Sequence, residues 1–395
     1  MKRTYLDYAA ATPIDTRVGA AMQKAEREVW ANASSLHHEG ELAKAKLEEA
    51  RIDVAKILHC RKNEIIFTSG GTEGANLAIL GIIKAAKTSH QIPHVITSTI
   101  EHPAVLEPIK YLLKEGMIEV SFVSPNEEGI INPQSIERET KSNTVLICIM
   151  HSNNEIGTIQ PIRKIKSAIE NSKLKIKNSS KVYLLVDASQ SACYEDVSVE
   201  RLGADVLILD GIKMYGPRGA GILVVRHAVR MAPIVFGGGQ EGGVRSGTEN
   251  VVGAVGLSEA LKICEATREK ESARLKKLRD YAIAKIITEI PPLRRGSARQ
   301  AVASLNGSHE FRLPNNINIC FPNTDSEFLV IKLDMLGFAV SAASACNTLS
   351  LENSSYVIES LGRPECASSS LRFTLGRDTK KSDLDKLIKA LKMIV

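Results

Sequence analysis

The feature that most constrains the fold is a regular alternation of short apolar runs with helical patterns, which starts at about residue 40. The runs that we expect to be strands read "EIIFTS", "HVITST", "EVSFVS", "TVLICIM", "VYLLVD" and "DVLILD". This βα rhythm predicts an α/β fold with a mainly parallel sheet and helices on both faces. Functional residues in such a sheet gather beyond the carboxyl ends of the strands.

The pattern changes after about residue 255. A long charged helix is expected over about 251–290, followed by a polar stretch rich in Pro, Arg and Gly, the strand "NNINICF" and the helix "SEFLVIKLDMLG". We interpret this part as a smaller α+β domain that the extreme N-terminus joins. The expected division is a large domain over 16–260 and a small domain formed by 1–15 and 261–395, which a chain of 395 residues can accommodate.

Charge, aromatic content and cysteine usage argue against several classes of protein. The net charge of +6 is spread along the chain and aromatic residues make up 4%, so nucleic acid is not an expected partner. No apolar run approaches the roughly 18–20 residues of a membrane span, so a membrane is not expected either. No apolar core of signal-peptide length is present at the start. Seven cysteines without a C-x-x-C pair predict neither a disulfide framework nor a structural metal site. We therefore expect a soluble, reduced, cytoplasmic protein.

Polar residues follow several of the predicted strands. Gly71 and Thr72, in "TSGGTEGANLAI", stand where a strand feeds a helix, and backbone N–H groups at a helix N-terminus can bind an anion. The same stretch is equally consistent with an ordinary turn that binds no anion. Asp187 and Gln190, in "VDASQ", follow another strand, and a functional role for that carboxylate needs a cation to pair with it.

His102 and Lys213 also follow predicted strands. His102 precedes a proline in "STIEHPAV", and by itself it reads as a structural hydrogen-bonding histidine. Lys213 lies in a turn between two apolar runs, in "LILDGIKMYGPRGAGILVV". Such a lysine either reaches into solvent or, in a pocket with other cations, becomes a neutral nucleophilic amine.

Together these signals match the requirements of pyridoxal 5'-phosphate: an anion site, a flat ring partner, a carboxylate for the pyridine nitrogen and a lysine for the aldehyde. At this point the chain resembles the cysteine desulfurases of the class V aminotransferase family, within the fold type I pyridoxal-phosphate enzymes. The resemblance covers nearly the whole chain and runs through "YLDYAAATPID", "SSLHHEG", "IIFTSGGTEGANLAI", "TSTIEHPAVLE", "IMHSNNEIGTIQPI", "VDASQS", "KMYGPRGAG", "GGGQEGGVRSGTEN", "NNINICF", "AVSAASACNT" and "SSLRFTLGR".

The resemblance implies a role for each residue around the cofactor ring. Lys213 would bond covalently to the aldehyde and Asp187 would pair with the pyridinium nitrogen. Gln190 would hydrogen-bond the phenolic oxygen, and His102 would stack on the ring and move protons.

The resemblance also implies residues for the phosphate and the substrate. Gly71 and Thr72 would bind the phosphate together with Thr248, which in this family comes from the other subunit, so the site would be complete only in a homodimer. Asn154 would contact the cofactor, and Asn154 and Arg372 would hold the substrate carboxylate, a task suited to a planar guanidinium.

Cys346, in the small-residue run "AVSAASACNT", would define the reaction. Its thiolate would take the sulfur of L-cysteine, leaving L-alanine and a persulfide on Cys346. Acceptors in iron–sulfur cluster assembly or tRNA thiolation would then receive the sulfur. A lone cysteine is more often a small buried hydrophobe, which is what we expect of Cys148 and Cys320 in their apolar strands.

The chain departs from the family pattern beside the lysine. The family usually has Ser-x-His-Lys, whereas this chain has Asp210, Gly211, Ile212 and Lys213. An aspartate next to a phosphate repels it unless the side chain turns away or pairs with a cation, and isoleucine offers no donor. We therefore expect this chain to bind the cofactor phosphate more weakly than is usual in the family.

Three other readings remain open at this stage. A selenocysteine lyase or another class V enzyme would share the lysine and the aspartate but would not depend on Cys346. A catalytically reduced member with a binding role is suggested by Asp210 and Ile212. A nucleotide-binding α/β protein is disfavoured because no Walker or dinucleotide fingerprint is present.

Overall fold

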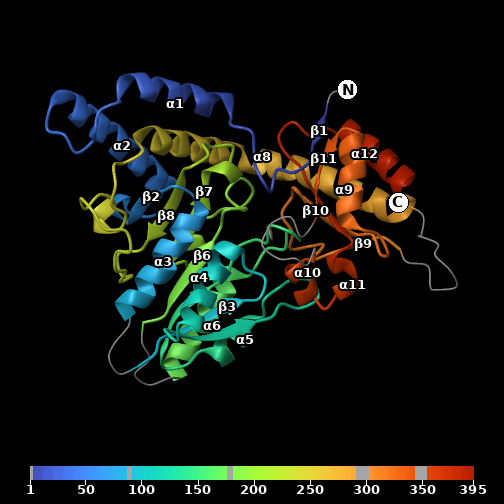
Figure 1. Ribbon diagram of the computed structural model, residues 1–395, viewed down its shortest axis with the longest axis horizontal. Coiled ribbons are helices and arrows are strands. Elements are labelled where there is room, and N and C mark those ends of the chain that lie inside the picture. The colour runs from blue at the N-terminus through green and yellow to red at the C-terminus, as the bar shows by residue number, and fades with distance from the viewer. Residues whose placement is uncertain (1–2, 87–90, 176–180, 291–301, 343–353) are drawn as a thin grey trace.

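A seven-stranded sheet forms the core of the larger part of the computed structural model (Figure 1). The structure describes residues 3–86, 91–175, 181–290, 302–342 and 354–395. The strand order is β2-β8-β7-β6-β5-β3-β4. Its strands are β2 (Ile65–Thr68), β3 (His94–Ser98), β4 (Glu119–Val123), β5 (Thr144–Cys148), β6 (Tyr183–Asp187), β7 (Val206–Asp210) and β8 (Gly221–Val225).

The sheet is parallel except for β8, which runs antiparallel to both β2 and β7. The pairs β3–β4, β3–β5, β5–β6 and β6–β7 are all parallel. The prediction of an α/β fold with a mainly parallel sheet is therefore confirmed. The reversal at β8 matters for the site, because the chain must turn back sharply after β7, and that turn carries Lys213.

Helices cover both faces of this sheet, as the alternation of apolar side chains along each strand requires. Along β3, for example, Val95 belongs to the core beneath α3 and α4, and Ile96 to the core beneath α2, α6 and α8. The helices of this part of the chain are α1 (Thr16–Glu28), α2 (His38–Ile57), α3 (Gly71–Ala86), α4 (Pro103–Lys114), α5 (Pro133–Glu139), α6 (Ile162–Lys175), α7 (Val199–Leu202) and α8 (Val251–Glu289). Three short 3-10 turns are η1 (Lys62–Glu64), η2 (Gly211–Lys213) and η3 (Glu241–Gly243).

The C-terminal part forms a second, antiparallel sheet of order β12-β13-β10-β9. The N-terminal strand β1 (Thr4–Tyr5) pairs in parallel with β11 (Phe338–Ala339). Helix α8 runs from the large sheet to this part and contacts both α2 and α12 (Figure 1). The remaining elements are β9 (Ser304–Leu305), β10 (Asn316–Cys320), α9 (Ser326–Met335), β12 (Ser341–Ala342), α10 (Tyr356–Ser360), α11 (Pro364–Ala367), β13 (Ser370–Thr374) and α12 (Lys381–Ile394). The division of the chain at 15/16 and 260/261 stays a prediction.

The cysteines correct one expectation. Cys320 and Cys366 form a disulfide with a Cα–Cα distance of 5.3 Å, so the expectation of a reduced chain, with Cys320 as a simple buried hydrophobe, is wrong for this pair. The two residues are 46 positions apart and meet because α11 packs against the end of β10, which the spacing of the cysteines does not reveal. Cys60, Cys148, Cys193 and Cys264 are free thiols.

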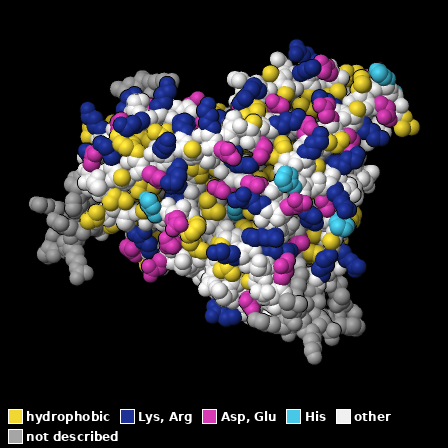
Figure 2. Space-filling view, turned by 180° about the vertical axis from the view of Figure 1, so that it is seen from behind, with side chains coloured by type: hydrophobic (Ala, Val, Ile, Leu, Met, Phe, Trp, Pro, Cys, Tyr) yellow, Lys and Arg dark blue, Asp and Glu magenta, His cyan; other side chains and the backbone are white. Residues whose placement is uncertain are grey.

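The surface carries charges of both signs. On the face seen in Figure 2, lysine and arginine side chains are interspersed with aspartate and glutamate rather than gathered in one basic patch. Among the described residues, no helix is both long enough and apolar enough to cross a membrane.

Candidate active site

A pocket lies at the edge of the large sheet where β5, β6 and β7 end. It brings together the predicted residues from five separate segments of sequence, because the carboxyl ends of parallel strands meet at one edge of a sheet. The residues that line it are Ala9, Gly71, Thr72, His102, Ala104, Met150, Ser152, Asn154, Asp187, Ser189, Gln190, Asp210 and Lys213.

Lys213 reaches this pocket from η2, directly after β7. Its Nζ donates to the backbone oxygens of Ala9 at 2.9 Å and Ala10 at 2.6 Å. The turn is tight because Gly211 N donates to Ala220 O at 3.0 Å and Gly216 N donates to Gly211 O at 3.0 Å. A Cβ on Gly211 would lie 2.6 Å from the backbone oxygen of Pro217, so a side chain at this position would force the turn apart.

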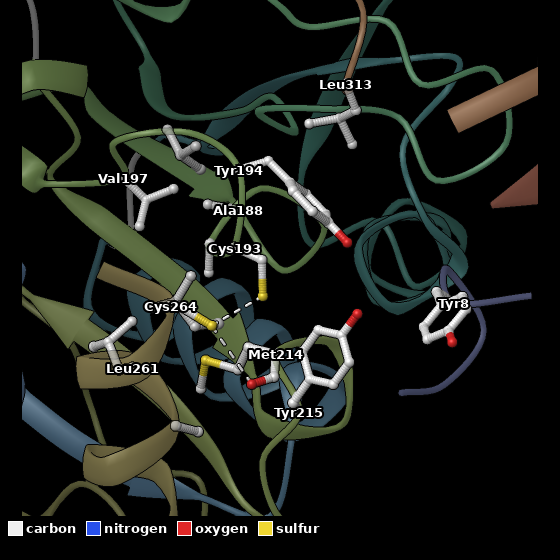
Figure 3. Close-up of a cluster of buried hydrophobic side chains, with 14 of the residues drawn as sticks. Tyr8, Ala188, Cys193, Tyr194, Val197, Met214, Tyr215, Leu261, Cys264 and Leu313 are labelled. Atoms are coloured by element: carbon white, nitrogen blue, oxygen red, sulfur yellow. Dashed lines mark hydrogen bonds between the residues drawn. The ribbon is translucent and has the colours of Figure 1, made fainter. Parts of the chain in front are cut away.

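Buried side chains pack against the turn that follows Lys213 (Figure 3). The Sγ atoms of Cys193 and Cys264 are 3.0 Å apart, and Cys264 Sγ donates to Met214 O at 3.6 Å. Tyr215 has a left-handed φ of 58°, a conformation that a bulky residue adopts only when its surroundings impose it. Its N–H donates to Thr12 Oγ1 at 2.8 Å, and the Arg377 guanidinium lies 4.0 Å from the ring centroid.

Asp187 ends β6 and faces the same pocket. Its Oδ1 accepts from Ser189 N at 2.9 Å and from Ser189 Oγ at 2.6 Å, and these two bonds set the orientation of the carboxylate. Gln190 Nε2 donates to Ala9 O at 3.0 Å, so Gln190 and Lys213 share one backbone acceptor. Ser189 was not predicted from the sequence, although it stands inside the "VDASQ" stretch that pointed to its neighbours.

His102 is the N-cap of α4, and Pro103 follows at the first helical position. Its Nδ1 accepts from Ala104 N at 3.1 Å, so the proton of the neutral ring is on Nε2. Burial lowers the pKa of His102. The carboxylate of Asp187 opposes this shift, the ammonium of Lys213 adds to it, and the carboxylate of Asp210 again opposes it. The balance leaves a neutral imidazole at neutral pH.

Glu101 precedes His102 in the sequence and is buried, with 1% of its surface exposed. It accepts from Ser98 Oγ, and the hydroxyl of Tyr356 in α10 donates to its backbone oxygen at 2.6 Å. Burial raises the pKa of Glu101 to about 8, because a carboxylate without water around it is costly.

Asp210, the last residue of β7, reaches the start of α3 and so lies beside Gly71. Its Oδ2 accepts from Gly71 N at 3.0 Å and its Oδ1 accepts from Ile212 N at 3.2 Å. The Asp210 side chain is thus not turned away from the predicted phosphate site. Among the described residues, it also forms no ion pair with a cation.

Arg372 does not line the pocket but contacts a residue that does. It extends from β13, is 1% exposed, and its Nη1 donates to Asn154 O at 2.9 Å. Its Nη2 donates to Asp7 Oδ1 at 2.9 Å, and its Nε has no hydrogen-bond partner among the described residues. The predicted role of Arg372 in holding a substrate carboxylate stays a prediction.

Thr248, like Arg372, is a predicted residue that the structure describes but that does not line this pocket. Thr248 is exposed, lies just before α8, and is not among the residues that line it. Cys346 lies outside the described residues, so its predicted role stays a prediction. Within the described ranges, no group of three or more His, Cys, Asp or Glu side chains is placed to hold a metal ion.

Ala9 and Asp7 were not expected at the site. The N-terminal segment that carries them crosses to the pocket because β1 pairs with β11 and because Asp7 bridges to Thr374. The local sequence does not predict the path of this N-terminal segment, because that path depends on pairing with residues more than 300 positions away.

Comparisons with known proteins point to one family. The family described as Aminotransferase class-V matches residues 4–387. The chain is 40% identical over 397 aligned positions to "Cysteine desulfurase IscS" of Dictyoglomus turgidum, covering 100% of this chain and 95% of that protein. Among solved structures, a "NifS-like protein" has a TM-score of 0.87 at 31% identity, with 99% of both chains covered. "SspA in complex with cysteine" has a TM-score of 0.76 at 32% identity, covering 94% of this chain and 98% of that one.

Proposed function

The chain belongs to the class-V aminotransferase family, among its cysteine desulfurases, and from this premise we propose that it converts L-cysteine to L-alanine and carries the released sulfur as a persulfide on Cys346. The observation that carries the proposal is the meeting of Lys213, Asp187 and His102 in one pocket at the carboxyl edge of a mainly parallel sheet. An amine, a carboxylate and a flat ring in one place are what pyridoxal 5'-phosphate requires.

The pocket residues fit this cofactor at its ring and aldehyde. Lys213 would bind the aldehyde carbon covalently, Asp187 would hold the protonated pyridine nitrogen, and His102 would cover one face of the ring. Gln190 would bind the phenolic oxygen. Gly71 and Thr72, at the N-terminus of α3, would bind the phosphate. When bound, pyridoxal 5'-phosphate supplies an electron sink for the charge left when the substrate loses its α-proton.

Arg372 is suited to the substrate carboxylate. Its guanidinium is buried, its Nε lacks a partner among the described residues, and it is fixed on the backbone of the pocket residue Asn154. A planar guanidinium held in this way binds a carboxylate in one orientation. The amino acid would then be presented with its α-carbon toward His102 and Lys213.

His102 and Lys213 are the groups placed to move protons. His102 is neutral at neutral pH because burial lowers its pKa, and its ring proton is on Nε2, so Nε2–H is the group from which it can donate to a bound substrate. Lys213 Nζ, within hydrogen-bond distance of Ala9 O and Ala10 O, supplies an amine in the same pocket. Both groups come from the ends of structural elements rather than from their interiors, and this leaves them accessible to a substrate.

The sulfur transfer is a displacement at the substrate sulfur. The Cys346 thiolate attacks the Sγ of L-cysteine, an S–S bond forms, and the Cβ–Sγ bond breaks with its electron pair moving to the carbon skeleton. Protonation of that skeleton gives L-alanine. The outer sulfur of the persulfide is then available to the thiolate of an acceptor protein.

We further propose that the enzyme is a cytoplasmic homodimer. Thr248 is exposed and does not line the pocket of its own chain, which supports the idea that it completes the site of a second subunit. The four free cysteines among the described residues favour a reducing compartment, in which Cys320–Cys366 would be a buried exception.

Acceptors in iron–sulfur cluster assembly or tRNA thiolation are the proposed recipients of the sulfur.

The test is the formation of alanine from L-cysteine with a thiol reductant, compared between the wild type and Cys346→Ala. Wild-type alanine production that nearly disappears in Cys346→Ala, together with a mass gain of one sulfur atom on the Cys346 peptide, would support the proposal. Cys60→Ala is the matched control, because Cys60 is a free thiol outside the pocket and should leave the rate unchanged. Alanine from both Cys346→Ala and the wild type would instead indicate a lyase that does not use this thiol.

A further inference from the structure

Asp210 occupies the position at which the chain departs from its family, and its carboxylate contacts the N-terminus of α3. Oδ2 accepts from the N–H of Gly71, the first residue of that helix, at 3.0 Å. Oδ1 accepts from Ile212 N at 3.2 Å, and this second bond keeps the side chain turned toward α3.

The carboxylate also fills the space in front of this helix. A Cβ built on Gly70 would meet Asp210 Oδ2 at 3.4 Å, and one built on Gly71 would meet it at 3.3 Å. Ser189 Oγ also lies 3.3 Å from that Gly71 position. A phosphate that used the backbone of Gly71 would therefore lie against the carboxylate of Asp210.

No cation of the described residues forms an ion pair with Asp210. Glu73, in the first turn of α3, is paired with Arg245 at 2.9 Å and accepts from Ser69 N. Lys213 Nζ donates to Ala9 O and Ala10 O. The Asp210 side chain therefore lies directly at the helix N-terminus, where an incoming phosphate would bring a charge of about −1.5 to −2 at neutral pH.

We propose that Asp210 determines how this enzyme holds the phosphate end of its cofactor: the carboxylate takes the Gly71 N–H that a phosphate oxygen would use and would repel that phosphate, so the phosphate adds less to affinity than this helix N-terminus would otherwise allow. This inference rests on the proposed function, which supplies the cofactor. It predicts an enzyme that exchanges pyridoxal 5'-phosphate readily and prefers it over pyridoxal, the same compound without the phosphate, by an unusually small factor.

The experiment compares the binding of pyridoxal 5'-phosphate and of pyridoxal to the full chain after removal of bound cofactor. Dissociation constants are measured by equilibrium dialysis for the wild type, Asp210→Asn and Asp210→Ser. Asn has the shape of Asp and keeps an oxygen for Gly71 N–H, while Ser removes the carboxylate from the space in front of α3. Glu107→Gln is the matched control, because it removes one negative charge from an exposed position on α4.

The expected result is specific to the phosphate. Both Asp210 variants should bind pyridoxal 5'-phosphate about 10- to 100-fold more tightly than the wild type, as expected when a nearby like charge is removed from a partly buried site. Their affinity for pyridoxal should change by less than about threefold, and Glu107→Gln should match the wild type for both compounds. Asp210→Asn keeps the test valid if Asp210→Ser disturbs the fold, which circular dichroism would reveal.

Two results would overturn the inference while leaving the proposed function intact. One is an unchanged ratio of the two dissociation constants in Asp210→Asn, and the other is weaker binding of pyridoxal 5'-phosphate in that variant. Failure of the wild type and of both variants to bind either compound would overturn the proposed function as well, so the two failures are distinguishable.

Discussion

Arg372 and Asp7 form an ion pair of 2.9 Å although 365 positions separate them in the chain. The same guanidinium donates to the backbone oxygen of Asn154 at 2.9 Å. The N-terminal segment, the last strand of the second sheet and the loop after β5 therefore meet at one side chain. This three-way junction joins the C-terminal part of the molecule to the pocket that is formed by the ends of the large sheet.

Replacing Arg372 with lysine should weaken substrate binding. Lysine keeps the positive charge but cannot hold Asn154 O, Asp7 and a substrate carboxylate at the same time, because it lacks the planar fork of donors. We expect the KM for L-cysteine to rise about tenfold or more, with a smaller change in kcat. Arg363→Lys is the control, since Arg363 binds Ser304 Oγ and Asn306 Oδ1 away from the pocket. An equal rise in KM for both variants would contradict a substrate role for Arg372.

Replacing Thr72 with alanine should release the cofactor. With Asp210 occupying Gly71 N–H, the Thr72 hydroxyl bears a larger share of the contact with the phosphate. We expect Thr72→Ala to bind pyridoxal 5'-phosphate at least about tenfold more weakly than the wild type, measured by cofactor absorbance after gel filtration. Thr267→Ala should behave like the wild type, because Thr267 Oγ1 donates to Ile263 O within α8. Full retention of cofactor by Thr72→Ala would count against this role.

Mixing two inactive variants should restore activity if the site is shared between subunits. Lys213 lines its own pocket, whereas Thr248 is exposed on the same chain and does not line it. In a heterodimer of Lys213→Ala and Thr248→Ala, one site carries both defects and the other carries neither. We expect a purified heterodimer to regain about half of the wild-type rate per dimer, while both homodimeric variants stay low. A heterodimer no more active than the two homodimers would indicate that Thr248 does not contribute to the active site of the other subunit.

The buried carboxyl of Glu101 should make stability depend on pH. Burial raises its pKa from 4.5 to about 8, so the folded protein retains a proton that the unfolded chain releases between these values. The stabilisation is fully present below pH 4.5 and is lost as the pH rises through about 8.

Glu101→Gln removes this dependence because glutamine cannot ionise. Its free energy of unfolding relative to the wild type should therefore increase between about pH 5 and pH 9, on the order of a few kcal/mol, since a tenfold change in an acidity constant corresponds to about 1.4 kcal/mol. Urea unfolding at several pH values measures this, with the exposed Glu107→Gln as control. Parallel pH profiles for Glu101→Gln and the wild type would show that Glu101 is ionised in the fold.

The Cys320–Cys366 disulfide should be detectable by peptide mapping and by its contribution to the free energy of unfolding. Peptide mapping without reductant should recover Cys320 and Cys366 in one linked fragment. Because the cross-link joins residues 46 positions apart, Cys320→Ser should lower the free energy of unfolding by up to about 4 kcal/mol under non-reducing conditions. Cys60→Ser should have a much smaller effect, since Cys60 is a free thiol. A wild-type unfolding midpoint that does not respond to reductant would mean that the two thiols are not bonded in solution.

The strands of the large sheet, the mainly parallel class of the fold and most of the residues that line the pocket could be predicted from the sequence. The alternation of apolar side chains acts over a few residues, and "VYLLVD" and "DVLILD" form β6 and β7 as the pattern predicts. Because parallel strands end at one edge, residues that follow these strands were expected to meet, and His102, Asp187 and Lys213 do share one pocket.

The partners of these residues depend instead on how distant segments pack. The path of the N-terminal segment brings Ala9 to Lys213 and Asp7 to Arg372, and it requires pairing between β1 and β11. The bond between Asp210 and Gly71 joins two elements 139 positions apart, and the Cys320–Cys366 disulfide depends on how α11 packs against β10. Local pattern specifies which face of an element is buried, but a contact between distant side chains exists only after several elements have packed together.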